Sequence, residues 1–210
     1  MTRLLIVGST GLVGGHALTQ ALADARFAQV VAPTRRPLPV QHAKLENPIV
    51  DFDALPASAP WWRVDAVVCA LGTTIGDAGS RGAFRRVDFD YVLAAATHAR
   101  DAGACSFALT SALGANPGSG NFYLRTKGEA EDALRSLGYP SLTLVRPSII
   151  GGEREQRRRM EHVTARLMLA LEPLVPRRYR VVRAERIAHC LLDAALAAEP
   201  GVCVVESERI

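Results

Sequence analysis

The chain has 210 residues, of which 49 % are hydrophobic, and its formal net charge is +4. This composition is typical of one folded domain and excludes a low-complexity or fibrous chain. The apolar stretch at the start breaks at Gly8, too early for a signal peptide, and no run approaches the roughly 18 apolar residues of a membrane span. We therefore expect a cytoplasmic protein that does not enter a membrane.

The first predicted element is a strand over residues 4–7, whose four apolar side chains indicate burial on both faces, as in a parallel sheet. Glycines follow in a GxxGxxG spacing, and apolar residues then recur at helical spacing. The N–H groups and the dipole of a helix that starts at such a turn attract an anion, usually a dinucleotide pyrophosphate. The predicted cofactor contacts are Gly8, Ser9, Thr10, Gly11, Leu12, Val13 and Gly14.

A second strand is predicted over residues 28–33, and its end should lie beside the adenine ribose of a dinucleotide. Thr34, Arg35 and Arg36 follow, where a carboxylate would favour NAD. Two guanidinium groups suit the 2′-phosphate of NADP, although they could also be surface arginines. A short third strand over residues 48–51 ends in Asp51, which could reach the adenine amino group or equally cap a turn.

Strands and helices then alternate along the chain. Residues 64–71 predict a buried strand that is followed by Gly72, Thr73 and Thr74. We expect these three residues, with Leu71, to contact the cofactor beyond the end of the strand. The other predicted strands cover residues 105–109, 141–145 and 202–205; the other predicted helices cover residues 83–101, 121–137, 163–174 and 184–198, and residues 75–81 form a loop. The alternation predicts an α/β fold, a doubly wound parallel sheet of the Rossmann type, in a single domain of residues 1–210.

The chain after the sixth strand has a different character. We expect residues 147–183 to form a short substrate-side region of loop and helix, with a charged run at residues 153–159. The arginines between residues 154 and 186 could bind nucleic acid, but no aromatic stacking set or recognition-helix pattern accompanies them. A solvated face or a pocket for an anionic substrate is simpler, so we expect no specific nucleic-acid binding.

The cysteines and histidines do not form a recognisable site. Cys69, Cys105, Cys190 and Cys203 contain no CxxC pair, and the apolar surroundings of the first, second and fourth predict buried, reduced thiols. The five histidines show no metal-ligand spacing, so no metal site is expected.

The strongest chemical signal is the spacing of Tyr123 and Lys127 in a predicted helix. Residues four apart share one helix face, so the ammonium group can lower the pKa of the phenol and also bind a ribose hydroxyl. The chain has four tyrosines and, besides Lys127, only Lys44 as a lysine, so the spacing would seldom arise by chance. Ser111, just after the preceding strand, can orient a carbonyl. The alternative is a surface Tyr and Lys that merely share a helix face.

Together these motifs resemble the short-chain dehydrogenase/reductase superfamily over nearly the whole chain. Residues 70–74, 111–116 and 123–129 are similar to its atypical NAD(P)-binding group, which includes the Tat-interacting oxidoreductase-like proteins. The resemblance implies that Ser111 polarises a substrate carbonyl, Tyr123 donates or accepts a proton, and Lys127 binds the nicotinamide ribose. It also implies that the nicotinamide carboxamide meets the backbone of the residues after the sixth strand, Pro147, Ser148 and Ile149.

Two functions remain open from the sequence. The first is an NADP(H)-dependent oxidoreductase that acts on a small carbonyl or alcohol and prefers NADPH to NADH. The second is a non-catalytic or weakly catalytic NADP(H)-binding regulator that signals to a protein partner. The Ser111, Tyr123 and Lys127 set favours the enzyme, whereas the short stretch after Arg146 favours the regulator and weakens a third reading, a sugar-nucleotide epimerase.

Overall fold

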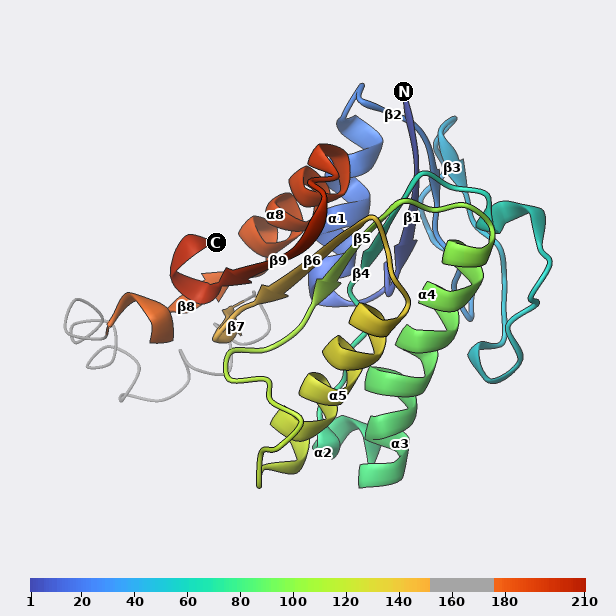
Figure 1. The fold of residues 1–210 in the computed structure, drawn as a ribbon. Helices are drawn as coiled ribbons and strands as arrows, with labels where there is room; N and C mark the ends of the chain where they lie inside the picture. The colour runs from blue at the N-terminus through green and yellow to red at the C-terminus, as the bar shows by residue number, and fades with distance from the viewer. Residues whose placement is uncertain (152–175) are drawn as a thin grey trace.

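A parallel seven-stranded sheet in the order β3-β2-β1-β4-β5-β6-β9 forms the centre of the computed structural model, which describes residues 1–151 and 176–210 (Figure 1). Its strands are β1 (Thr2–Val7), β2 (Phe27–Val31), β3 (Leu45–Glu46), β4 (Ala66–Cys69), β5 (Ser106–Thr110), β6 (Ser141–Arg146) and β9 (Gly201–Glu206). The predicted doubly wound, single-domain α/β fold is therefore confirmed.

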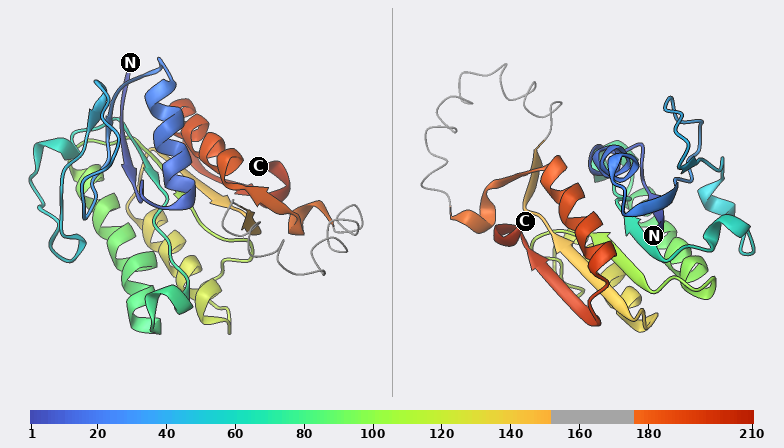
Figure 2. Two further views of the ribbon diagram at one scale, coloured as in Figure 1. Left: turned by 180° about the vertical axis from the view of Figure 1, so that it is seen from behind. Right: turned by 90° about the horizontal axis from the view of Figure 1, so that it is seen from above.

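Helices cover both faces of the sheet (Figures 1 and 2). On one face α1 (Leu12–Ala23) and α8 (Ala184–Ala197) pack against strand residues that include Leu4 and Ile6. On the other, α4 (Tyr91–Asp101) and α5 (Phe122–Ser136) cover a second core, to which Leu5 and Val7 belong. Because alternate residues of β1 enter opposite cores, the strand must be apolar at every position, which is why the run at residues 4–7 was diagnostic.

Shorter elements complete the fold. A small separate sheet pairs β7 (Ile149–Gly151) in parallel with β8 (Val181–Arg183), which brings the two ends of the predicted substrate-side region together beyond β6. The predicted helix at residues 163–174 and the charged run at residues 153–159 lie outside the described residues. Further short helices in residues 1–151 and 176–210 are α2 (Ile75–Ala78), α3 (Arg81–Arg85), η1 (Phe52–Ala54), η2 (Pro60–Trp62), η5 (Arg177–Tyr179) and η6 (Ser207–Arg209).

Two element predictions are wrong. The third strand is β3 at Leu45–Glu46, and the predicted residues 48–51 contribute an isolated bridge between Ile49 and Thr34. Polar Glu46 is tolerated in this edge strand because its carboxylate accepts hydrogen bonds from Arg3 at 3.0 Å and Gln29 at 2.8 Å. The predicted loop at residues 75–81 begins with helix α2.

The cysteine prediction holds in part. Cys69 is buried at the end of β4, and burial raises the pKa of its thiol to about 11. Cys105 and Cys203 are exposed, contrary to the prediction, because one precedes β5 and the other lies in β9, at the edge of the sheet. All four thiols are free.

Close backbone packing shapes the turn between β1 and α1. Gly8 has a φ of +89°, and a Cβ there would lie 2.7 Å from the backbone of Ala70 and Leu71. A Cβ at Gly14 would lie 2.0 Å from the Gly8 carbonyl oxygen. Because Gly14 lacks a side chain, the first turn of α1 can approach the end of β1. Because Gly8 lacks one, the end of β1 can approach the segment after β4.

Gly14→Ala should lower the free energy of unfolding by about 2 kcal/mol, because the added methyl group forces rigid backbone apart. The matched control is Gly15→Ala, whose Cβ would meet the Ser9 carbonyl oxygen at an ordinary 3.7 Å. Alanine at this helical position should be neutral or stabilise by about 0.5–1 kcal/mol. Urea unfolding of both variants without cofactor measures the difference, and equal stability would contradict the tight turn.

Candidate functional site

Several of the predicted site residues lie where the parallel strands β1, β4 and β5 end. Gly72, three residues past the end of β4, lies beside side chains from two helical segments. A Cβ on Gly72 would be 3.5 Å from a carboxylate oxygen of Asp88 and 3.6 Å from Nζ of Lys127. The structure therefore places Gly72 beside Lys127, both of them predicted cofactor contacts, and adds Asp88, which the sequence did not indicate.

Helix α5 starts at a defined point and so fixes the placement of Tyr123 and Lys127. The side chain of Asn121 caps the helix by accepting hydrogen bonds from the backbone N–H groups of Tyr123 at 2.9 Å and Leu124 at 3.3 Å. Tyr123, in the first turn, is half-buried and packs its ring against Phe84, with 5.4 Å between ring centroids. Lys127 follows one turn later on the same face.

Lys127 is a buried cation. Its side chain is 5 % exposed and lies 2.7 Å from the carboxylate of Asp88, which is fully buried. Its Nζ also donates to the carbonyl oxygen of Thr110, at the end of β5, at 3.5 Å. Burial alone would lower the pKa of Lys127, but Asp88, with smaller contributions from Tyr123 and Cys69, raises it above its usual value. Lys127 is therefore charged at neutral pH.

Asp88 lies in an irregular part of its helix. The single helix predicted over residues 83–101 is α3, then a π-helical turn, η3 (Arg86–Asp90), and then α4. The second carboxylate oxygen of Asp88 accepts a hydrogen bond from the Thr73 N–H at 2.9 Å. Single π turns are rare in proteins, and those that occur are often found at functional sites. The helical spacing of Asp88 with three buried apolar residues could have indicated that Asp88 faces the core. These residues, Val92, Ala95 and Ala99, form one buried stripe with it.

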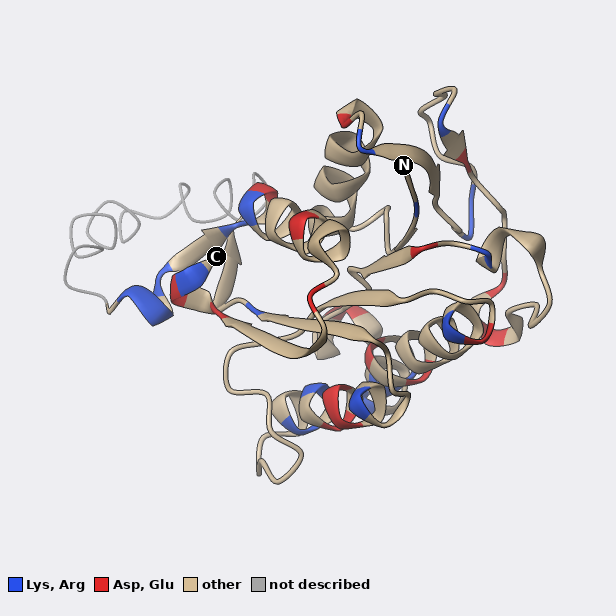
Figure 3. Cartoon of the chain, turned by 45° about the horizontal axis from the view of Figure 1, so that its top comes forward, with Lys and Arg blue, Asp and Glu red and all other residues tan. Residues whose placement is uncertain are grey.

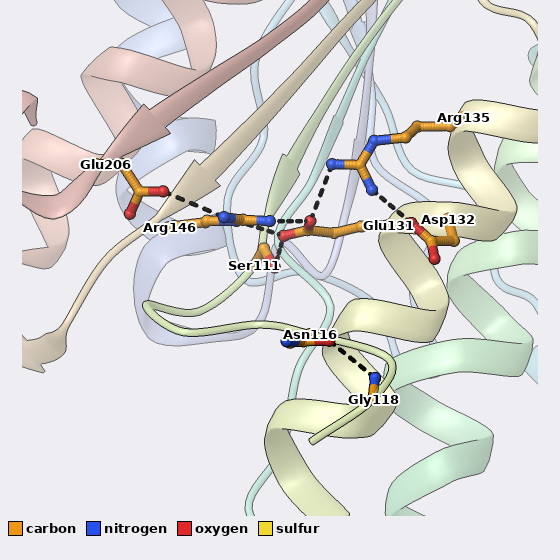
Figure 4. A network of polar contacts seen from close by, with 8 residues as sticks. All are labelled: Ser111, Asn116, Gly118, Glu131, Asp132, Arg135, Arg146 and Glu206. Atoms are coloured by element: carbon orange, nitrogen blue, oxygen red, sulfur yellow. Dashed lines mark hydrogen bonds and ion pairs between the residues drawn. The ribbon is translucent and has the colours of Figure 1, made fainter.

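Ser111 lies at the end of β5 as predicted, but its hydroxyl is engaged (Figure 4). It donates to Glu131 Oε1 at 2.6 Å, and Glu131, on α5, is 1 % exposed. Arg146 donates hydrogen bonds to both carboxylate oxygens of Glu131, at 2.9 and 2.6 Å, and Arg135 donates a third at 3.2 Å. The hydrogen bond to Glu131 raises the pKa of Arg146, and Arg146 also binds Glu206 at 3.1 Å. Glu131 is a second residue that the sequence analysis missed.

The glycine turn has the features of a pyrophosphate site. Gly11 is the N-cap of α1 and offers no side chain to its first N–H groups. Ser9 is 3 % exposed, and its hydroxyl has no partner among the described residues. Leu12 is 44 % exposed beside the turn, and Thr10 is exposed too. Unpaired donors, a helix dipole and a backbone free of Cβ atoms fit a dinucleotide phosphate.

The predicted adenine-side residues lie near the ends of β2 and β3. Thr34 is buried and donates its hydroxyl to the Arg36 carbonyl at 2.7 Å, while Arg35 and Arg36 are exposed. Asp51 caps η1 by accepting from the Asp53 N–H at 3.0 Å, which is the turn-capping alternative.

The segment after β6 is already bonded within the protein. The Pro147 carbonyl accepts from the Leu113 N–H at 2.9 Å, and the Ser148 N–H donates to the Ser207 hydroxyl at 3.1 Å. The Ser148 hydroxyl donates to the Arg180 carbonyl, and Ile149 is 45 % exposed. Of the three residues expected to meet the carboxamide, the first two therefore have internal partners.

Charged side chains lie mostly on helices and connecting segments, with a group of arginines around η5 and the start of α8 (Figure 3). Arg177, Arg178 and Arg183 are exposed there, while Arg186 donates to the Ile210 carbonyl. Across residues 1–151 and 176–210, no three His, Cys, Asp or Glu side chains gather as metal ligands, and no helix is long and apolar enough to cross a membrane.

Comparisons with known proteins agree with this geometry. A family model described as NAD(P)H-binding matches residues 8–196. The mitochondrial protein FMP52 of Lodderomyces elongisporus is 34 % identical over 163 residues, which cover 73 % of this chain and 68 % of that protein. HTATIP2 of Rattus norvegicus is 35 % identical over 159 residues, which cover 74 % of this chain and 65 % of that protein.

Solved structures show the same fold at low sequence identity. MoeE5 in complex with UDP-glucose and NAD has a TM-score of 0.71 at 18 % identity, over 96 % of this chain and 74 % of that one. A short-chain dehydrogenase family protein from Francisella tularensis has a TM-score of 0.70 at 13 % identity, over 100 % of this chain and 98 % of that one.

The comparisons also correct one prediction. A cytoplasmic location was expected from the sequence, but the FMP52 relatives from Lodderomyces elongisporus and Emericella nidulans are named as mitochondrial proteins. The prediction of a cytoplasmic location is therefore wrong by this comparison.

Asp88→Asn tests the buried ion pair, because the amide keeps an oxygen for the Thr73 N–H but loses the charge beside Lys127. Near pH 7 the free energy of unfolding should fall by about 3–5 kcal/mol, the usual cost of removing one partner of a buried pair. Burial is then opposed only by the smaller contributions of Tyr123 and Cys69, and it lowers the pKa of Lys127. The folded variant binds this proton less tightly than the unfolded chain does, which costs stability at neutral pH.

The stability loss in Asp88→Asn should shrink between pH 7 and about pH 10 because of the change in the variant. In the wild type, the raised pKa of Lys127 stabilises the fold fully below its unfolded pKa, about 10.4, so this contribution is still present at pH 10 and is lost only at higher pH. In the variant, the penalty fades as Lys127 deprotonates in the unfolded chain as well. Urea unfolding at both pH values measures the change. Asp90→Asn, at an exposed position, is the control and should stay within about 0.5 kcal/mol. A loss that does not depend on pH would contradict the pairing.

Proposed function

From the premise that the chain belongs to the NAD(P)H-binding family and is an atypical short-chain dehydrogenase/reductase similar to HTATIP2, we propose that it is an NADP(H)-dependent oxidoreductase acting on a small carbonyl or alcohol. One observation carries the proposal. Tyr123 stands one helical turn from Lys127, a buried and charged lysine, at the edge of the sheet where the glycine turn fits a pyrophosphate.

The chemistry divides between the cofactor and this chain. A bound nicotinamide cofactor would supply a hydride to a carbonyl carbon or accept one from an alcohol. Tyr123 would give its proton to the substrate oxygen in the first direction and take it back in the second. The ammonium of Lys127, one helical turn away, would stabilise the negative charge that develops on the Tyr123 oxygen as the proton leaves.

Lys127 has a second role in the proposal. Of its three N–H donors, one faces Asp88 and one faces the Thr110 carbonyl, which leaves one for a ribose hydroxyl. Asp88 fixes the direction of this donor. We therefore place Asp88 with Tyr123 and Lys127 as a positioning residue of the site.

The proposed cofactor preference rests on the residues that follow β2. Arg35 and Arg36 are exposed beyond this strand. The hydroxyl of the neighbouring Thr34 donates to the Arg36 carbonyl and accepts from the Asn47 side chain, which holds Thr34 in place. The planar forks of the two arginines suit the 2′-phosphate of NADPH. We propose that they select NADPH over NADH.

A second function has its own support. The Ser111 hydroxyl is bonded to Glu131, and Pro147 and Ser148 have partners within the protein. These groups were expected to face substrate or nicotinamide. Their engagement favours an NADP(H)-binding regulator, in which the cofactor-bound state would be read by a protein partner.

A screen of NADPH oxidation across small aldehydes, ketones and quinones decides between the two functions. The enzyme proposal expects at least one compound to be reduced with saturable kinetics. Tight NADPH binding without turnover of any class would favour the regulator.

Tyr123→Phe should lower kcat by a factor of about 10² or more, because it removes the proton donor and nothing else. The phenylalanine ring keeps its packing against Phe84, so folding and NADPH binding should survive. Tyr91→Phe is the matched control, since the Tyr91 hydroxyl bonds Asp53 instead, and its kcat should stay within about twofold. Steady-state rates with any substrate from the screen measure this, and wild-type turnover in Tyr123→Phe would refute the role.

Replacing Arg35 and Arg36 together with alanine should weaken NADPH binding by about tenfold or more and leave NADH binding unchanged. Only NADPH carries the 2′-phosphate that these side chains are proposed to hold. The control is Arg63→Ala, at an exposed position before β4. Fluorescence titration with both cofactors measures the effect. Equal weakening of NADPH and NADH would count against the assignment.

A further inference from the structure

The hydrogen bond between Ser111 and Glu131 has only one possible direction. The two oxygen atoms are 2.6 Å apart, and both residues are buried, at 3 % and 1 % exposure. Glu131 accepts from two arginine side chains at the same time, so it is an ionised carboxylate with no proton to give. Ser111 is therefore the donor, and its one hydroxyl proton is committed to Glu131.

This commitment limits what Ser111 can offer a ligand. A serine hydroxyl has one proton and two lone pairs, so Ser111 can only accept a further hydrogen bond. A bare carbonyl oxygen also only accepts. Placed against Ser111, it would have no hydrogen bond there, and releasing the proton would break a charge-assisted bond in a buried place. The group that meets Ser111 must therefore carry a hydrogen of its own.

The surrounding network keeps Glu131 in place. Arg146 is held from its other side by Glu206 at 3.1 Å, so β6, β9 and α5 together fix the carboxylate (Figure 4). Glu131 also follows Lys127 by four residues, which puts Tyr123, Lys127 and Glu131 along one face of α5. On this face Tyr123 can donate a hydrogen bond. Ser111, which is bonded to Glu131 on the same face, can accept one.

We propose that Glu131 is a positioning residue that makes Ser111 a hydrogen-bond acceptor, so that the site fits a substrate with a hydroxyl on the carbon next to its carbonyl, an α-hydroxy ketone or aldehyde. The inference rests on the proposed carbonyl reduction. Tyr123 donates to the carbonyl oxygen, and the neighbouring substrate hydroxyl donates to Ser111. The carbonyl carbon gains the hydride of NADPH and its oxygen gains the Tyr123 proton, which gives a vicinal diol and NADP⁺.

The test compares two alcohols that differ by one hydroxyl, 1,2-propanediol and 2-propanol. Both are products of carbonyl reduction and cannot react with NADPH, so their binding to the full chain is measured by NMR titration, with and without NADPH. The wild type should bind the diol at least tenfold more tightly, and Ser111→Ala should bring the ratio close to one. Ser111→Ala leaves Glu131 paired with Arg146 and Arg135, so the fold should be retained.

Two further variants separate positioning from structure. Ser111→Thr keeps a hydroxyl and should restore the preference for the diol. Asp132→Asn is the matched control, because Asp132 lies next to Glu131 and pairs with Arg135 at 2.7 Å, yet is exposed and is not bonded to Ser111. Its ratio should equal that of the wild type. Equal binding of the two alcohols by the wild type, or an unchanged ratio in Ser111→Ala, would overturn the inference.

The proposed function is read separately, from NADPH oxidation with hydroxyacetone and acetone. Reduction of hydroxyacetone with higher kcat/KM than acetone supports both the function and the inference. Reduction of acetone with the higher kcat/KM supports the function and overturns the inference. If neither compound supports NADPH oxidation, the oxidoreductase proposal loses support. The ratio of 1,2-propanediol binding to 2-propanol binding still decides the role of Ser111.

Discussion

A charged lysine buried beside an aspartate is the interaction on which the candidate site depends. Lys127 lies 2.7 Å from Asp88, and the aspartate outweighs the burial that would otherwise lower the lysine pKa. The pair joins α5 to the π turn before α4, and Asp88 also holds the Thr73 N–H after β4. Buried charges are costly, and perturbed groups of this kind gather at functional sites.

A second buried carboxylate organises the other end of the same helix face. Glu131 ties α5 to β6 through Arg146, and Arg146 continues the connection to β9 through Glu206. The two carboxylates act differently on the proposed chemistry. Asp88 keeps Lys127 charged and oriented, whereas Glu131 accepts the hydrogen bond of the Ser111 hydroxyl and so, in our proposal, changes what that residue can recognise. The site is therefore set as much by these supporting acids as by Ser111, Tyr123 and Lys127.

The sequence was sufficient for the fold and for the placement of the main site residues, because these leave strong local patterns. Apolar runs identified the central strands, and Gly8 and Gly14 marked a turn that tolerates no side chain. Asp88 and Glu131 were missed because a charged residue on a helix usually faces solvent, and their partners are distant in sequence. The third strand was misplaced because β3 has only two residues and one is Glu46.

The most direct measurement of the central claim is a crystal structure of the chain with bound NADP⁺. We expect the pyrophosphate to lie over the turn at Gly8, Gly11 and Gly14, and the 2′-phosphate to lie against Arg35 and Arg36. We also expect the nicotinamide ribose within hydrogen-bond distance of Lys127 Nζ, which should remain paired with Asp88. A cofactor bound away from the glycine turn, or a nicotinamide end that does not reach Lys127, would contradict the central claim.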